Sequence, residues 1–285
     1  MEAEIKPTAL TMKNKYIAGI YNYCDYWCER CPFTKRCRNY ATDRELELEM
    51  EARDPSKPEP DDATNADFWK RIAHKTRDAA IFGKAEEWQD VAFVEDDFDI
   101  DPEWYAREEA ITNAARQHPL MRLADAYREN MHAWLKTADA DLKEVAQNLI
   151  SAAANQLDTE DYEEQAREIG ELLEVVTWYH TLISAKTNRA IRGLLEHASP
   201  EYKKDSMLAG FRLEDANGSA KLTLVSIERS IGAWLRLREI LPTQEDAILQ
   251  HLSMLDRLRR GLITALPGAK AFFRPGFDGE PPEDN

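Results

Sequence analysis

The chain has 285 residues, with 37 Lys and Arg against 53 Asp and Glu, which gives a formal net charge of −16. No apolar run approaches the roughly 20 residues that a membrane-spanning helix needs, and no apolar segment follows the acidic amino terminus. We therefore expect a cytoplasmic protein without a membrane span or signal peptide. Surfaces that coat nucleic acid are basic, so the sequence pI of about 4.9 argues against extensive nucleic-acid binding.

Residues 1–53 form an N-terminal arm that we expect to bind metal and to end in a short helix at 41–53. All four cysteines of the chain lie in this arm: Cys24, Cys28, Cys31 and Cys37. Their spacing, C-x3-C-x2-C-x5-C, brings four soft sulfur ligands into one short segment. Thiolates select zinc or iron–sulfur clusters over hard cations. In the cytoplasm, two disulfides are a poor alternative.

The arm is also basic, since residues 1–40 contain seven Lys and Arg against four Asp and Glu. The bases nearest the cysteines are Arg30, Lys35, Arg36 and Arg38. Such neighbours are expected to lower the thiol pKa values and to offset the charge of a four-thiolate centre. We expect the arm to dock on the acidic remainder of the chain through salt-sensitive attraction, or to contact a protein or another anionic partner.

Three interpretations of the cysteine quartet remain open: an iron–sulfur cluster, a zinc site, and free or redox-active thiols. Four-cysteine zinc sites draw mostly on two knuckles separated by a longer stretch. This segment has a single knuckle, Cys28-Glu29-Arg30-Cys31. Closely spaced ligands are more typical of a cluster, whose several irons accept thiolates from one loop. We expect an iron–sulfur cluster used in redox chemistry, sensing or partner recognition. The alternative is a zinc-stabilised helical interaction protein without enzymatic activity.

Residues 28–37, CERCPFTKRC, resemble the C-x2-C-P-[aromatic]-x3-C segment of the iron–sulfur staple in RecB-like nucleases. The resemblance implies a [4Fe–4S] cluster, with ligand roles for Cys28, Cys31 and Cys37. The family's fourth cysteine is distant, whereas Cys24 is local, and the acidic and lysine residues of the nuclease sheet have no counterpart here, so we do not carry over nuclease activity. Cys24-x3-Cys28-x2-Cys31 also has the spacing of radical-SAM enzymes, but the alternating strands and helices of their barrel are missing.

The rest of the chain is expected to be an all-α helical bundle at 64–268. It follows a proline-rich linker at 54–63 and precedes a disordered acidic tail at 269–285. Periodic apolar residues and helix-start signals predict the helices. Their expected ranges are 64–84, 103–116, 119–136, 139–156, 160–197, a helix from a turn at 215–219 to Leu241, and 243–265. A strand-like piece is expected at 91–94.

Three residues could form a second metal site inside the bundle. His180 and His251 lie on the apolar faces of helices 160–197 and 243–265, and Glu228 lies at the edge of the apolar face of the helix between them. If these helices pack together, the three side chains could converge on one metal, as in an iron oxidase. The alternative is that each histidine makes one buried hydrogen bond. Glu129-x-x-His132 has the spacing of di-iron four-helix proteins, but it falls near the opposite face from its helix's apolar stripe, as two surface polar residues would.

Overall fold

The structure is a computed structural model that describes residues 15–51, 102–155, 160–204 and 206–279. The chain divides into two compact units, one made of Met1–Ala41 and Tyr105–Asn285 and the other of Thr42–Trp104. The cysteines therefore belong to the same unit as the bundle. The expected linker, helix 64–84 and strand-like piece 91–94 lie outside the described residues.

The described residues form helices and turns and contain no strand, so the all-α fold class is confirmed. The helices are α2 (Arg38–Glu51), α4 (Pro102–Gln117), α5 (Pro119–Thr137), α6 (Asp139–Asn155), α7 (Glu160–Ala198), α8 (Ser206–Ile240) and α9 (Glu245–Ala265). Within these residues, no helix is both long enough and apolar enough to span a bilayer.

Local sequence explains several helix boundaries. Pro119 occupies the first turn of α5, where its missing N–H is not needed, and the ring nitrogen Nδ1 of His118 accepts a hydrogen bond from Leu120 N at 3.2 Å. Pro242 follows the end of α8 and starts a short 3-10 turn, Pro242–Gln244, before α9. These signals place the helix ends within a few residues of their expected positions.

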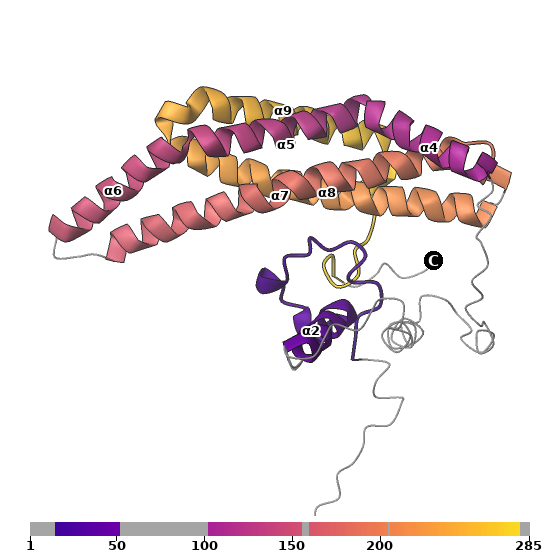
Figure 1. The fold of residues 1–285 in the computed structure, drawn as a ribbon, viewed down its shortest axis with the longest axis horizontal. Helices are drawn as coiled ribbons and strands as arrows, with labels where there is room; N and C mark the ends of the chain where they lie inside the picture. Colours follow the sequence, from indigo (N-terminus) through magenta and orange to yellow (C-terminus); the bar gives the residue numbers. More distant parts are fainter. Residues whose placement is uncertain (1–14, 52–101, 156–159, 205, 280–285) are drawn as a thin grey trace, which may run out of the picture. The chain divides into compact units, whose positions relative to one another are not determined.

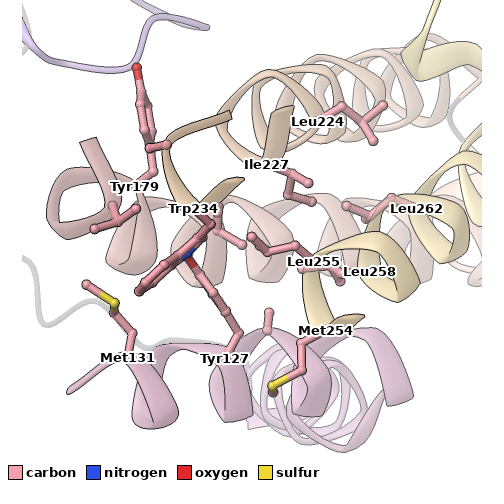
Figure 2. Close-up of a cluster of buried hydrophobic side chains, with 14 of the residues drawn as sticks. Tyr127, Met131, Tyr179, Leu224, Ile227, Trp234, Met254, Leu255, Leu258 and Leu262 are labelled. Atoms are coloured by element: carbon pink, nitrogen blue, oxygen red, sulfur yellow. The ribbon is translucent and has the colours of Figure 1, made fainter. Parts of the chain in front are cut away.

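Helices α5, α7, α8 and α9 pack against one another and enclose the core (Figure 1). Trp234 of α8 is fully buried, and its indole N–H donates to the Tyr127 hydroxyl of α5 at 3.1 Å. Figure 2 shows this pair with Met131 on one side and the leucines of α9 on the other. The leucine stripe of α9 is buried at Leu255, Leu258 and Leu262, as its spacing predicts.

The turn expected at residues 215–219 is not present, because α8 continues through it from Ser206 to Ile240. Asp, Asn, Gly and Ser favour turns because their side chains or backbone freedom support non-helical conformations. Tertiary contacts override this preference here. Asp215 accepts two hydrogen bonds from Arg189 of α7, and Gly218 provides room for two aromatic rings described below.

The structure also differs from expectation over residues 269–279, where the sequence composition indicated disorder. Ala269 is fully buried, and Arg274 pairs with Asp278 at 2.7 Å. Gly276 has a φ of +80°, and a Cβ at this position would meet Ile20 Cδ1 at 2.9 Å, so glycine suits both the turn and the contact. Proline and glycine here form turns that pack on the chain, which composition alone does not reveal. Residues 280–285 lie outside the described residues.

Candidate metal centre

The four cysteines lie on a chain of tight turns in residues 15–41, which we call the cysteine segment. Cys28 opens a 3-10 turn, Cys28–Arg30, and Cys31 closes it with a backbone hydrogen bond of 3.2 Å to Cys28 O. A second turn, Thr34–Arg36, is closed in the same way by Cys37. Cys37 directly precedes α2, and its carbonyl accepts the first bond of that helix from Ala41 N. The turns thus set the spacing of the ligand candidates.

One small cavity, of about 20 Å³, is lined by all four cysteines. The rings of Tyr21, Tyr26, Trp27, Tyr40 and Phe277 also line it. All four thiols are free and partly buried. All four cysteines therefore border a single, largely aromatic space.

Backbone amides point at two of the four sulfur atoms. Phe33 N donates to Cys31 Sγ at 3.4 Å, and Tyr40 N donates to Cys37 Sγ at 3.5 Å. Hydrogen bonds of this kind orient the ligands of a metal site. The thiol of Cys24 instead donates to Tyr21 O at 3.5 Å, while a backbone hydrogen bond from Tyr26 acts on Cys24 in the direction that lowers its pKa.

Burial acts in the opposite direction, and it has the larger effect on thiol pKa. Burial and then the charges of the neighbouring cysteines raise the pKa of Cys28 to about 11. Burial likewise raises the pKa of Cys24. The sequence-based expectation that nearby bases lower these pKa values is therefore wrong for these two thiols. Lys35 and Arg36 are exposed, while Arg30 contacts Glu174 and the Trp27 ring instead.

Asp25, directly after Cys24, connects the cysteine segment to α7 and α8. Its carboxylate accepts hydrogen bonds from the Tyr179 hydroxyl at 2.7 Å and from Arg229 at 2.6 Å. Its backbone carbonyl accepts the indole N–H of Trp178 at 2.9 Å. One residue thus receives donors from two bundle helices.

Stacked aromatic rings continue this contact. Trp27 stacks on Trp178 of α7 with ring centroids 5.1 Å apart. The Arg30 Cζ atom lies 4.3 Å from the centroid of the Trp27 ring. Arg30 also pairs with Glu174 of α7. Because aromatic stacking and hydrogen bonds dominate here, the docking surface differs from the simple charge attraction that the sequence suggested.

Gly218, in the middle of α8, lies beneath two rings. A Cβ at this position would meet Tyr23 Cε1 at 2.3 Å and Phe272 Cζ at 2.7 Å. Tyr23 and Phe272 themselves pack edge to face, with centroids 4.6 Å apart, and the Tyr23 hydroxyl donates to Asp215 at 3.3 Å. The helix therefore has glycine where the cysteine segment and the C-terminal residues approach it.

Two positions beside the cysteines were not identified from the sequence: Asp25 and Lys186. Lys186 of α7 is buried, its ammonium lies 4.9 Å from the Tyr26 ring centroid, and Cys24 acts on it electrostatically. Burial lowers the pKa of Lys186. The sequence does mark Lys186 as unusual, since this charged residue lies within an apolar stripe, three residues after Ile183 and four before Ala190.

The backbone of Tyr26 has a φ of +58°, and this conformation turns the chain between Cys24 and Cys28.

The second metal site expected in the bundle is not formed by the side chains as they stand. His180 contacts His132 instead, and His251 lies among aromatic rings. Glu228 is exposed and lines a groove of about 390 Å³ between α8 and α9. Across the described ranges, no three His, Cys, Asp or Glu side chains, the four cysteines included, form a group that could hold a metal ion in the observed side-chain positions. Helical periodicity predicts which face of a helix a residue lies on. It does not predict how far along the helix axis that residue lies relative to residues on the neighbouring helices.

His251 is 2 % exposed, and neither ring nitrogen has a hydrogen-bond partner. Its ring stacks on Trp234 at a centroid distance of 4.6 Å, and Tyr127 meets it edge-on at 5.9 Å. Burial lowers the pKa of His251 to about 4. The expectation of one buried hydrogen bond therefore does not hold for this histidine, which serves as a neutral aromatic ring in the core.

No protein-family description matches the sequence, and searches of curated proteins and of solved structures found no match to it.

Proposed function

We propose that this chain is a metal-binding protein in which Cys24, Cys28, Cys31 and Cys37 hold a [4Fe–4S] cluster. The observation that carries the proposal is the single cavity that all four cysteines line. Two backbone N–H···S contacts support ligand roles for Cys31 and Cys37. The resemblance of residues 28–37 to an iron–sulfur staple supports the same assignment.

The spacing of the four cysteines along the chain favours a cluster over a single ion. Zinc sites with four cysteines draw mostly on two separate knuckles, whereas this segment has one knuckle, Cys28–Cys31. In a cluster each thiolate bonds its own iron, so closely spaced ligands from one segment can all be used. Aromatic walls would shield such a cluster and tune its potential.

The cluster is proposed to act in sensing, through the docking of the cysteine segment. Ligands and docking residues alternate along the chain: Tyr23 and Cys24, then Trp27 and Cys28, then Arg30 and Cys31. A segment this short cannot build a core, so metal binding supplies much of its folding energy. Loss or damage of the cluster would therefore release Asp25 and Trp27 from α7 and α8.

The released basic segment would then bind a protein or another anionic partner. Four free cysteines fit a reducing compartment such as the cytoplasm.

Zinc is the second candidate, because the Cys28–Cys31 turn is as compact as a zinc knuckle. In that case the chain is a zinc-stabilised interaction protein without catalytic activity.

Anaerobic purification of the full chain distinguishes the two candidates. The proposal predicts brown protein that absorbs near about 400 nm and carries about four irons and four sulfides per chain. Cys28→Ser should lose the colour, while Arg36→Ala, an exposed change in the same segment, should keep it. A colourless anaerobic preparation with one zinc that Cys28→Ser fails to bind would establish the second candidate instead.

A further inference from the structure

A pair of histidines on α5 and α7 has the geometry of a second metal site, separate from the cysteines. The Nε2 atoms of His132 and His180 lie 3.2 Å apart, and the two rings meet at 80° with centroids 4.8 Å apart. Two imidazoles at 2.0–2.1 Å from one tetrahedral ion place their nitrogens about 3.3 Å apart. The observed separation therefore matches two ligands that share an ion.

Hydrogen bonding prepares His180 for this role. Its Nδ1 lies 2.5 Å from Thr177 O, a carbonyl that can only accept, so Nδ1 carries the proton. The lone pair of the neutral ring is then on Nε2, which faces His132. Metal-binding histidines are held in the same way, with the second ring nitrogen donating to a carbonyl or carboxylate. Burial lowers the pKa of His180, which favours the neutral ring.

The surroundings leave one side of the pair open. His132 is exposed, whereas His180 is only 4 % exposed, so an ion could enter from the α5 side and keep water ligands. Glu129 lies three residues before His132 on the same helical face and is 74 % exposed at its side chain. The cation Arg128 acts on His180, and Asp125 partly balances it through a contact of 3.4 Å.

We propose that His132 and His180 bind a first-row divalent transition ion, with Zn²⁺ as the commonest choice for imidazole ligands. The ion would connect α5 to α7 through one ligand from each helix. The proposal does not depend on the cysteine centre. A hydrogen bond between the two rings without metal affinity is the competing interpretation.

Zinc titration of the full chain as purified tests the proposal. Calorimetry should show that the wild type binds an additional Zn²⁺ ion that His132→Gln does not bind, or binds at least about 10-fold more weakly. His197→Gln, a change at another histidine, serves as the matched control and should bind like the wild type. His132 is the preferred target because it is exposed, so its substitution leaves the fold intact.

Long-range ¹H–¹⁵N spectra of histidine-labelled protein provide a direct readout. Zn²⁺ should shift the Nε2 signals of His132 and His180 together, and leave that of the buried His251 in place. Equal zinc stoichiometry and affinity in the wild type and His132→Gln would overturn the proposal, because the ion would then be bound elsewhere. Nε2 signals of His132 and His180 that do not move with Zn²⁺ would overturn it as well.

Discussion

The cysteine segment and the helical bundle are stabilised in different ways. The bundle buries a continuous core around Trp234, Tyr127 and the leucines of α9 (Figure 2). Among the described residues of the cysteine segment, only Ile20 is buried. The cysteine segment is held in its conformation by turns, by contacts with α7 and α8 and, in our proposal, by metal. The comparison indicates that the bundle is stabilised by its own core, whereas the cysteine segment depends on contacts outside itself.

The largest effect is expected from removing a ligand. Cys28→Ser should abolish metal binding at the cysteines, because the remaining three cannot complete the proposed centre, and it should unfold residues 15–41. Circular dichroism should still report nearly full helix content, because the bundle core is unchanged. Loss of bundle helicity on this substitution would show that the two regions do not differ as described.

The second prediction concerns the pH dependence of the bundle. The pKa of His251 falls from 6.5 to about 4 on folding, so the native state binds fewer protons than the unfolded state below pH 6.5. The contribution of His251 to the free energy of unfolding is therefore fully present above pH 6.5. It is lost as the pH falls toward 4, which lowers the free energy of unfolding by up to about 3 kcal/mol.

Urea unfolding at a series of pH values measures this dependence. His251→Phe keeps an aromatic ring at this position and should flatten the decline between pH 6.5 and 4. His197→Gln should leave the decline as it is. An unchanged slope in His251→Phe would assign the acid sensitivity to other groups.

The third prediction separates docking from helix propensity. Gly218→Ala and Gly232→Ala both replace glycine within α8, and either should favour the helix by about 0.5–1 kcal/mol. No atom lies within 4 Å of a Cβ at position 232. At position 218 the Cβ meets Tyr23 and Phe272, which should weaken docking by about 1–3 kcal/mol.

Limited proteolysis of residues 15–41 reports this difference directly. Gly218→Ala should be cut faster than the wild type, while Gly232→Ala should be cut at the wild-type rate. Equal rates for the two variants would mean that Tyr23 and Phe272 do not pack on α8.

The smallest effect is expected from salt. Arg30–Glu174 and Arg229–Asp25 are partly exposed ion pairs, each contributing no more than about 1 kcal/mol. The Trp27–Trp178 stack is not screened by ions. Proteolytic protection of the cysteine segment should therefore change little between low and high salt, in contrast to the salt-sensitive docking expected from charge alone. A steep loss of protection would restore the electrostatic interpretation.

The sequence predicted the helices well because their apolar stripes are long and regular. α7 was expected at 160–197 and runs from Glu160 to Ala198. The sequence misplaced features that tertiary contacts decide. Gly218 indicates a turn locally, yet it serves as a contact surface within a helix. Phe272 and Phe277 are in a polar, proline-rich tail, yet both pack against aromatic rings of the cysteine segment.

The sequence predicted that the four cysteines lie close together, but it did not predict their surroundings. Four cysteines at short spacing border one space because chain connectivity keeps them close. The roles of Asp25 and Lys186 depend on which helices face the cysteines, and spacing does not contain that information. The same limit explains why His180 was expected beside His251, whereas the level of the helix crossing brings it to His132.

Hydrogen exchange on the full chain before and after metal removal tests the central claim most directly. The account predicts that amides of residues 15–41 lose protection when the metal is removed, together with the side of α7 around Trp178 and Tyr179. Amides of α9 should keep theirs. Equal protection of residues 15–41 with and without metal would contradict the claim that the four cysteines hold a centre on which this segment depends.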